Sequence, residues 1–167
     1  MNTDRFFVRF DESPEILVAG LRRHHDISDL SLTIPQQWNE FRRLLPVVTT
    51  SRGRILGAYC GTSANQLEYL TGQEIAGFRE APAGFGRMLI PAQRYAVFHH
   101  AGHVSETGST WERIWNDWLP GSGYEDAETP PFELYERAFD PNTGDGGFEI
   151  WIPIRKRRQS SGKAGGL

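Results

Sequence analysis

The alternation of hydrophobic and polar positions predicts two successive units with the same order of elements. In the first unit, apolar residues recur at helical spacing from Trp38 to Val48, after a proline suited to a first helical turn. The runs on either side are short, rich in apolar and β-branched residues, and separated by polar turn residues. We expect a strand at 14–23, a helix at 34–48, and strands at 54–62 and 66–76.

The second unit repeats this order. Its helix carries three tryptophans and an isoleucine on one face, and Pro120 and Gly121 follow as a stop signal. The last two strand-like runs are joined by the turn sequence DPNTGDGG. We expect a strand at 93–103, a helix within 105–123, and strands at 131–139 and 147–154.

A duplicated β-α-β-β unit predicts an α+β fold. Its simplest form is one antiparallel sheet with both helices on one face. The opposite face would then be covered by loops, covered by a partner, or left open as a ligand groove. Residues 1–154 would make up this domain. Residues 155–167 (RKRRQSSGKAGGL) are basic and rich in glycine and serine, which predicts a disordered tail, with a weak contact to nucleic acid as the alternative.

One acidic residue in a strand-like run suggests a binding site. Side chains alternate across a strand, so Glu133 and Tyr135 share one face of residues 132–135 (FELY). In residues 148–154 (FEIWIPI), the phenylalanine and isoleucines would face the helices and Trp151 would face away. If Phe and Leu of FELY also face the helices, the acid, the tyrosine and the tryptophan line the groove. The alternative is a solvated Glu133 and a Trp151 that fills a loop contact.

The second unit resembles a known family. The strand YAVF with its following His and Gly, the helix ending WLPGSGY, the strand PFELY and the closing EIWIPI are similar to GyrI-like, or AraC-type effector-binding, domains. GAYCGT and EYLTGQEI match more loosely, and the resemblance covers about residues 6–154. It implies a duplicated fold with two helices and a groove, in which a glutamate matching Glu133 pairs with lipophilic cations.

This reading gives a set of candidate ligand-binding residues. Burial among aromatic rings penalises a bare carboxylate, and an arriving cation relieves that penalty while the rings stack on its body. Tyr59 is a counterpart from the first unit or simply a core residue, and Trp111 opens a helical stripe that is more often core. The candidates are Glu133, Tyr135, Trp151, Tyr59 and Trp111.

Composition limits the other functions. The net charge is −3 and the pI near 6.0, so the chain as a whole lacks the basic footprint of a nucleic-acid-binding protein. Cys60 is the single cysteine, which excludes an intramolecular disulfide and fits a reducing cytoplasm. No run approaches the length of a membrane span. The adjacent pairs His24–His25 and His99–His100 point to opposite strand faces, so we expect no metal site, and no cofactor.

Three function classes remain. The favoured one is a cytoplasmic binding protein that senses or sequesters lipophilic, aromatic, often cationic small molecules. The resemblance also allows a hydrolase of strained, reactive drug-like compounds, with Glu133 as general acid or base and Tyr135 as a proton donor. The third is a regulator that binds a protein partner such as gyrase. Only about a dozen residues precede the first predicted strand, too few for a helix-turn-helix module, so we expect no one-chain transcription factor.

Overall fold

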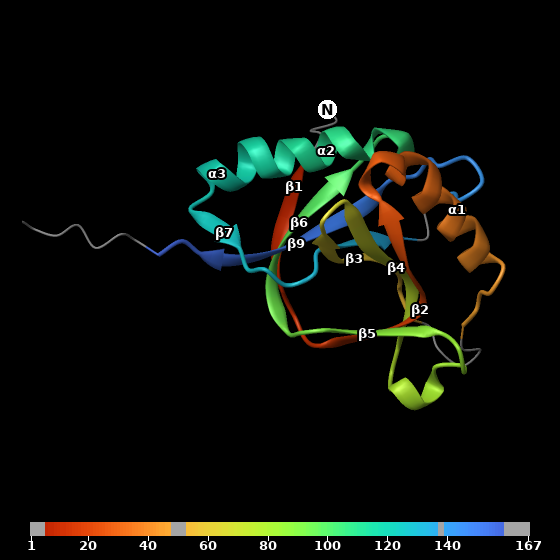
Figure 1. Ribbon diagram of the computed structural model, residues 1–167. Coiled ribbons are helices and arrows are strands. Elements are labelled where there is room, and N and C mark those ends of the chain that lie inside the picture. Colours follow the sequence, from red (N-terminus) through yellow and green to blue (C-terminus); the bar gives the residue numbers. More distant parts are fainter. Residues whose placement is uncertain (1–5, 48–52, 137–138, 159–167) are drawn as a thin grey trace, which may run out of the picture.

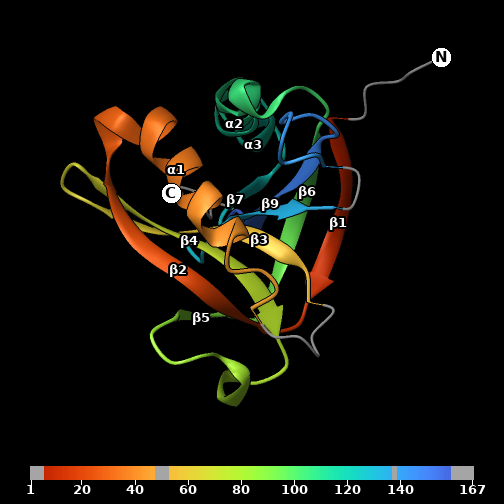
Figure 2. The same ribbon diagram turned by 90° about the vertical axis from the view of Figure 1, so that its right-hand side faces the viewer.

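A computed structural model of the protein describes residues 6–47, 53–136 and 139–158. The described chain forms one antiparallel sheet with two main helices, α1 and the run α2–η4–α3, which both lie over the same face (Figures 1 and 2). This confirms the predicted α+β class. Within these residues, no helix has the length and apolar character needed to cross a membrane.

The repeat predicted from the sequence is present as β2-α1-β3-β4 followed by β6-α2-β8-β9. The elements of the first part are β1 (Phe7–Ser13), β2 (Ile16–Asp26), η1 (Ile27–Asp29), α1 (Leu30–Arg42), β3 (Ile55–Ser63), β4 (Gln66–Ile75), η2 (Phe78–Glu80) and β5 (Gly86–Ile90). Those of the second part are β6 (Gln93–His100), η3 (Val104–Glu106), α2 (Thr107–Arg113), the π-helical segment η4 (Ile114–Trp118), α3 (Leu119–Gly121), β7 (Tyr124–Asp126), β8 (Phe132–Tyr135) and β9 (Phe148–Lys156).

The structure differs from the sequence prediction in three respects. Strands β1, β5 and β7 were not predicted. Helix α1 begins at Leu30, so Pro35 lies inside the helix and not in its first turn. Strand β9 continues to Lys156, two residues past the boundary placed at 154, and Arg155 there forms an ion pair with Glu125 of β7 (Nε–Oε1 2.8 Å). Residues 159–167 of the predicted tail lie outside the described residues.

The strand order makes the sheet curl. The order is β1-β6-β9-β8-β3-β4-β2-β5, so the two units meet where β8 pairs with β3. Only Pro14 and Glu15 separate β1 from β2, although these strands lie near opposite ends of the order. Such a short link brings the two ends of the sheet toward each other, as the curved strands in Figure 1 show.

Both faces of the curled sheet are therefore packed. Under the helices lie two clusters, one centred on Phe41 of α1 and one on Ile114 of the α2 run. The face away from the helices, expected to form a groove, carries a third buried cluster. Its members are Ile16, Val18, Leu56, Ala58, Leu70, Met88, Ile90, Tyr95, Val97, Phe132, Leu134 and Trp151. Curling of the sheet encloses these side chains, so the helix face is where a site near the surface can form.

Candidate functional site

Glu133 lies in the middle of the sheet and points toward the helices. It is opposite Gly57 on β3 and opposite Ile150 on β9, whereas Phe132 is opposite Trp151. Directly opposite residues share a face, so Glu133 belongs to the side of Ile150 and Phe132 to the side of Trp151. Alternation along the strand correctly predicted that Glu133 and Phe132 lie on opposite faces of the sheet. The prediction that Glu133 lies on the face away from the helices is wrong, because alternation within each strand does not fix the register between strands.

Four neutral donors surround the carboxylate of Glu133. Oε1 accepts from the Tyr59 hydroxyl at 2.7 Å and from Nε1 of Trp111 at 3.2 Å. Oε2 accepts from the Tyr135 hydroxyl at 2.7 Å and, at a long 3.5 Å, from the Tyr69 hydroxyl. Three of the predicted site residues thus converge on Glu133.

The same residues form an aromatic enclosure. The rings of Tyr59 and Trp111 meet edge to face at 5.0 Å, and those of Tyr135 and Trp38 at 4.7 Å. Trp38 also donates from Nε1 to the Tyr69 hydroxyl at 3.1 Å. We call this set the Glu133 cluster; its members are Trp38, Tyr59, Tyr69, Trp111, Glu133 and Tyr135.

The cluster is closed at its centre and accessible at its rim. Glu133 is only 4% exposed and Tyr69 is fully buried, while Tyr59, Trp111 and Tyr135 are half-buried. Its members come from α1, α2 and strands β3, β4 and β8, so the rings bridge the two helices across the sheet. A flat apolar molecule would meet ring surface before it met the carboxylate.

Burial and the nearby carboxylate keep the phenols protonated. Burial raises the pKa of Tyr59, Tyr69 and Tyr135 well above the ordinary tyrosine value, and the negative charge of Glu133 raises each pKa further. All three hydroxyls therefore remain hydrogen-bond donors throughout the physiological pH range.

A second buried carboxylate has a different environment. Glu149, 9% exposed, accepts two hydrogen bonds from the Arg9 guanidinium (3.0 and 3.1 Å) and one from Nε1 of Trp151 (2.9 Å). Arg9 also lies over the Trp151 ring, at 5.4 Å from its centroid. Glu149 thus has an internal cation. No cation of the described chain bonds to Glu133.

Trp151 does not belong to the predicted site. It is 3% exposed and packs on the face away from the helices, against Phe132 and Tyr95. The prediction that Trp151 faces away from the helices is confirmed. The expectation that it lies near Tyr135 over a groove is wrong, because the strand register places Tyr135 with Glu133 on the helix face. Tyr69 and Trp38 were not among the predicted site residues, because their contacts form only when β4 and α1 pack together with β8.

The paired histidines are divided between solvent and core, as expected from strand alternation. His25 and His100 are buried, and each hydrogen-bonds through Nδ1 to a threonine of the following helix, Thr33 at 2.8 Å and Thr110 at 2.7 Å. Their neighbours in the pairs are exposed. Across the described residues, no three His, Cys, Asp or Glu side chains gather as a metal site.

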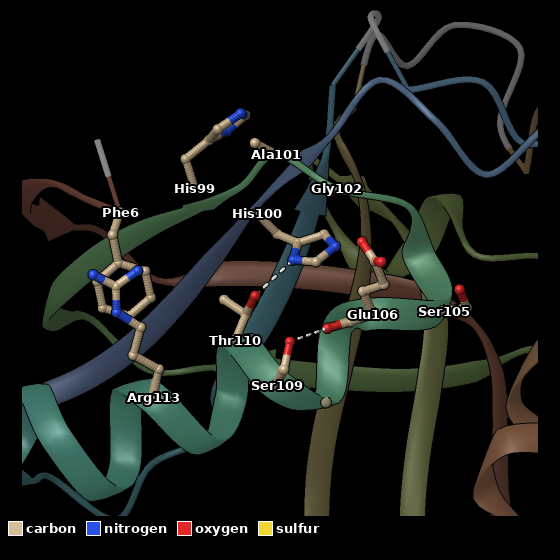
Figure 3. A pocket seen from close by; sticks show the side chains of 11 residues that line it. Phe6, His99, His100, Ala101, Gly102, Ser105, Glu106, Ser109, Thr110 and Arg113 are labelled. Carbon is tan, nitrogen blue, oxygen red and sulfur yellow. Dashed lines mark hydrogen bonds between the residues drawn. The ribbon is translucent and has the colours of Figure 1, made fainter. Parts of the chain in front are cut away.

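A separate surface hollow of about 550 Å³ lies beside the start of α2 (Figure 3). His99, His100 and Glu106 contribute to its wall, and the Arg113 guanidinium covers the ring of Phe6 at 3.9 Å from its centroid. No member of the Glu133 cluster lines this hollow. The cavity and the buried carboxylate are therefore distinct features.

Comparison with known proteins gives one family match and several relatives. The GyrI-like small molecule binding domain family matches residues 6–155. The transcriptional regulator BrlR of Pseudomonas aeruginosa is 29% identical over 152 residues, which cover 87% of this chain and 54% of BrlR. A DNA gyrase inhibitor of Erwinia billingiae is 27% identical over 162 residues, covering 89% of this chain and 97% of the inhibitor. This chain thus spans about half the length of BrlR.

Solved structures share the fold. The structure of SAV2435 bound to tetraphenylphosphonium has a TM-score of 0.70 at 15% identity. The superposition covers 89% of this chain and 93% of the SAV2435 chain. EcmrR in a complex with DNA has a TM-score of 0.66 at 18% identity, and the superposition covers 91% of this chain and 59% of the EcmrR chain. Identities this low show the fold alone. The family match, in contrast, extends over nearly every described residue, and this chain belongs to the GyrI-like small molecule binding domain family.

Proposed function

We propose that this protein binds lipophilic aromatic cations at the Glu133 cluster. The observation that carries the proposal is a buried carboxylate with four neutral donors and no cation of the described chain bonded to it. Neutral hydrogen bonds replace part of the lost hydration, but the net negative charge stays uncompensated in the interior. A cationic guest would supply the compensating charge, as Arg9 does for Glu149.

The aromatic rings supply the rest of the binding energy. Trp38, Tyr59, Trp111 and Tyr135 present ring faces and edges around one anion, which suits a guest with aryl groups and a positive centre. The relative SAV2435, which shares this fold, is described as bound to tetraphenylphosphonium, a cation of that class. This similarity supports the choice of ligand.

Entry requires a change at the rim. With Glu133 only 4% exposed, a guest gains close contact with the carboxylate only if a ring above it moves. Trp38 is the candidate, because it belongs to helix α1, is half-buried and makes no hydrogen bond to Glu133 itself. We propose that the guest enters between α1 and α2.

Replacement of Glu133 tests the proposal. Glu133→Gln should weaken tetraphenylphosphonium binding by about 10- to 100-fold, corresponding to about 1–3 kcal/mol for a lost charge-assisted contact. Neutral triphenylphosphine oxide should bind both proteins alike. Titration calorimetry measures both ligands. Equal losses for both would show that the carboxylate maintains the fold and does not recognise charge.

Glu112→Gln is a suitable control. Glu112 is exposed on α2, next to Trp111 in the sequence. Its replacement removes one negative charge, as Glu133→Gln does, but from the surface of the helix that carries Trp111. Screening by solvent makes the effect of a surface charge small. Tetraphenylphosphonium affinity should therefore change less than twofold, on the order expected for an exposed group.

Hydrolysis is less well supported by the resting geometry. A general base needs an oxygen free to take a proton from water. Each oxygen of Glu133 already accepts two hydrogen bonds, and the raised pKa of Tyr135 makes its phenol a weaker acid for the role of proton donor. Mass spectrometry of electrophilic aromatic compounds incubated with the protein would detect turnover and overturn this preference.

A role toward gyrase is a second candidate, favoured by one observation. The inhibitor of Erwinia billingiae is matched along 97% of its length. A supercoiling assay with purified gyrase tests this candidate directly. Inhibition that persists in Glu133→Gln would indicate a protein-binding surface independent of the small-molecule site.

A further inference from the structure

We infer that the Glu133 cluster selects permanently charged cations that lack N–H groups, such as quaternary ammonium and phosphonium ions, over protonated amines with the same aromatic body. This inference rests on the proposed function, because it presupposes that cations bind at Glu133. Its basis is the number of hydrogen bonds that the carboxylate already accepts.

An ionised carboxylate offers about four acceptor positions, two on each oxygen. Tyr59 and Trp111 approach Oε1, and Tyr135 and Tyr69 approach Oε2. The hydrogen-bonding capacity of Glu133 is therefore filled by the protein itself. A cationic guest is therefore attracted electrostatically to the carboxylate but has no free acceptor position there for a hydrogen bond.

The longest of these contacts is supported by a second hydrogen bond. The Tyr69 hydroxyl lies 3.5 Å from Oε2 of Glu133 and accepts a hydrogen bond from Nε1 of Trp38 at 3.1 Å. Because the indole N–H uses a lone pair of the hydroxyl, the single hydroxyl hydrogen remains available to face Glu133. Trp38 thereby orients Tyr69 as a donor toward the carboxylate.

Glu149 shows what a carboxylate with spare capacity does. Within the described part of the chain its one neutral donor is Trp151, and two of its remaining positions accept the N–H groups of Arg9 at 3.0 and 3.1 Å. The same sheet thus contains one carboxylate paired with an N–H cation and one whose acceptor positions are filled by neutral groups. The second arrangement suits a cation that needs no acceptor.

A protonated amine loses water when it enters such a site. Its N–H groups would then depend on the phenolic oxygens of Tyr59 and Tyr135, which are weaker acceptors than an anion. An unsatisfied buried donor is costly. A trimethylammonium or phosphonium centre has no N–H groups and keeps its attraction to Glu133 and to the rings.

Three ligands with one biphenylmethyl body separate these effects. Their head groups are trimethylammonium, ammonium and the neutral carbon isostere tert-butyl. We expect the trimethylammonium ligand to bind about tenfold or more tightly than either of the others, from the scale of one unmade hydrogen bond. Titration calorimetry or quenching of tryptophan fluorescence gives the three dissociation constants.

Tyr135→Phe tests the cause of the selectivity. This variant keeps the ring and frees one acceptor position on Oε2 of Glu133. The ammonium ligand should then gain, so the preference for trimethylammonium should fall by about fivefold or more. Tyr95→Phe is the matched control, because Tyr95 is buried in the cluster on the opposite face and its hydroxyl makes no hydrogen bond to Glu133. The Tyr95→Phe protein should prefer trimethylammonium over ammonium to the same degree as the native protein.

The outcomes distinguish the inference from the function on which it rests. If the neutral ligand binds as tightly as the trimethylammonium ligand, the proposed cation binding fails. If both cations bind better than the neutral ligand but ammonium equals trimethylammonium, cation binding stands and the inference is overturned. An unchanged preference in Tyr135→Phe also overturns it. Tyr59→Phe, which frees a position on Oε1, replaces Tyr135→Phe if that variant does not fold.

Discussion

The ring of Phe132 lies nearly parallel to the indole of Trp151, with centroids 5.3 Å apart and planes at 19°. The two residues are opposite each other on β8 and β9 and share the face away from the helices. Because neighbours along a strand alternate, this pairing directs Glu133 to the helix face. The position of the candidate site follows from this one aromatic pair.

Trp151→Ala should destabilise the protein strongly. The side chain is 3% exposed within a packed cluster, so its removal leaves a large cavity. We expect the free energy of unfolding to fall by about 3–5 kcal/mol, measured by urea denaturation. The fraction that remains folded should bind tetraphenylphosphonium with native affinity, because the Glu133 cluster lies on the other face.

Ile150→Ala is the informative comparison. Ile150 is fully buried and lies directly opposite Glu133, on the helix face. Its truncation should lower stability by about 2–5 kcal/mol and also weaken cation binding, since the floor of the cluster changes. A Trp151→Ala protein of native stability that has lost cation binding would show that the two faces have been assigned in reverse.

Gly57→Ala should disturb the site from below. A methyl group at Gly57 would lie 2.0 Å from the Tyr69 hydroxyl oxygen and 3.0 Å from Cζ2 of Trp38, so both rings would have to shift. We expect a loss of about 1–3 kcal/mol in stability, typical of overpacking, together with weaker tetraphenylphosphonium binding. Gly77→Ala serves as the control, because a methyl group there lies more than 4 Å from every heavy atom of the described residues beyond Gly77 and its two chain neighbours, and the backbone is extended. Comparable effects in both variants would argue against a steric role of Gly57.

Alkaline pH should destabilise the folded state through the buried tyrosines. The pKa of Tyr59, Tyr69 and Tyr135 is raised in the folded protein, so these groups keep their protons after the unfolded chain has begun to lose them near pH 10, the ordinary value. Their contribution to stability is complete below about pH 10 and decreases as the pH rises further. Urea denaturation at increasing pH measures this slope.

Removal of one phenol should reduce that slope. Tyr59→Phe deletes one group of raised pKa, so its unfolding free energy should fall less steeply above about pH 10 than that of the native protein. Native stability that stays constant through this range would contradict the burial of the three phenols.

Cys60 should react slowly in the folded protein. Burial raises the pKa of its thiol to about 11, which leaves little thiolate at neutral pH. Alkylation by iodoacetamide, followed by mass spectrometry, should accelerate markedly in urea, where burial is lost. Since Cys60 is the single cysteine, the denatured chain is its own control. Equal rates in both states would show an exposed thiol.

The sequence by itself determined the order of elements in each unit and the alternation within each strand. The spacing of apolar residues predicted β2-α1-β3-β4 and its repeat, because helix and strand periodicities follow from local backbone geometry. The same local rule placed Glu133 with Tyr135 and apart from Phe132. Strands β1 and β5 escaped detection, because they are fixed by pairing with β6 and β2, which are distant in the sequence.

Only the tertiary structure decided which face Glu133 occupies and which rings surround it. A shift of one residue between β8 and β9 exchanges the two faces, and alternation along each strand is identical in both registers. Tyr59 and Glu133 are 74 positions apart, and Tyr69 and Glu133 are 64 apart. Such contacts depend on the packing of the whole curled sheet against α1 and α2, because no local backbone preference brings side chains so distant in the sequence together.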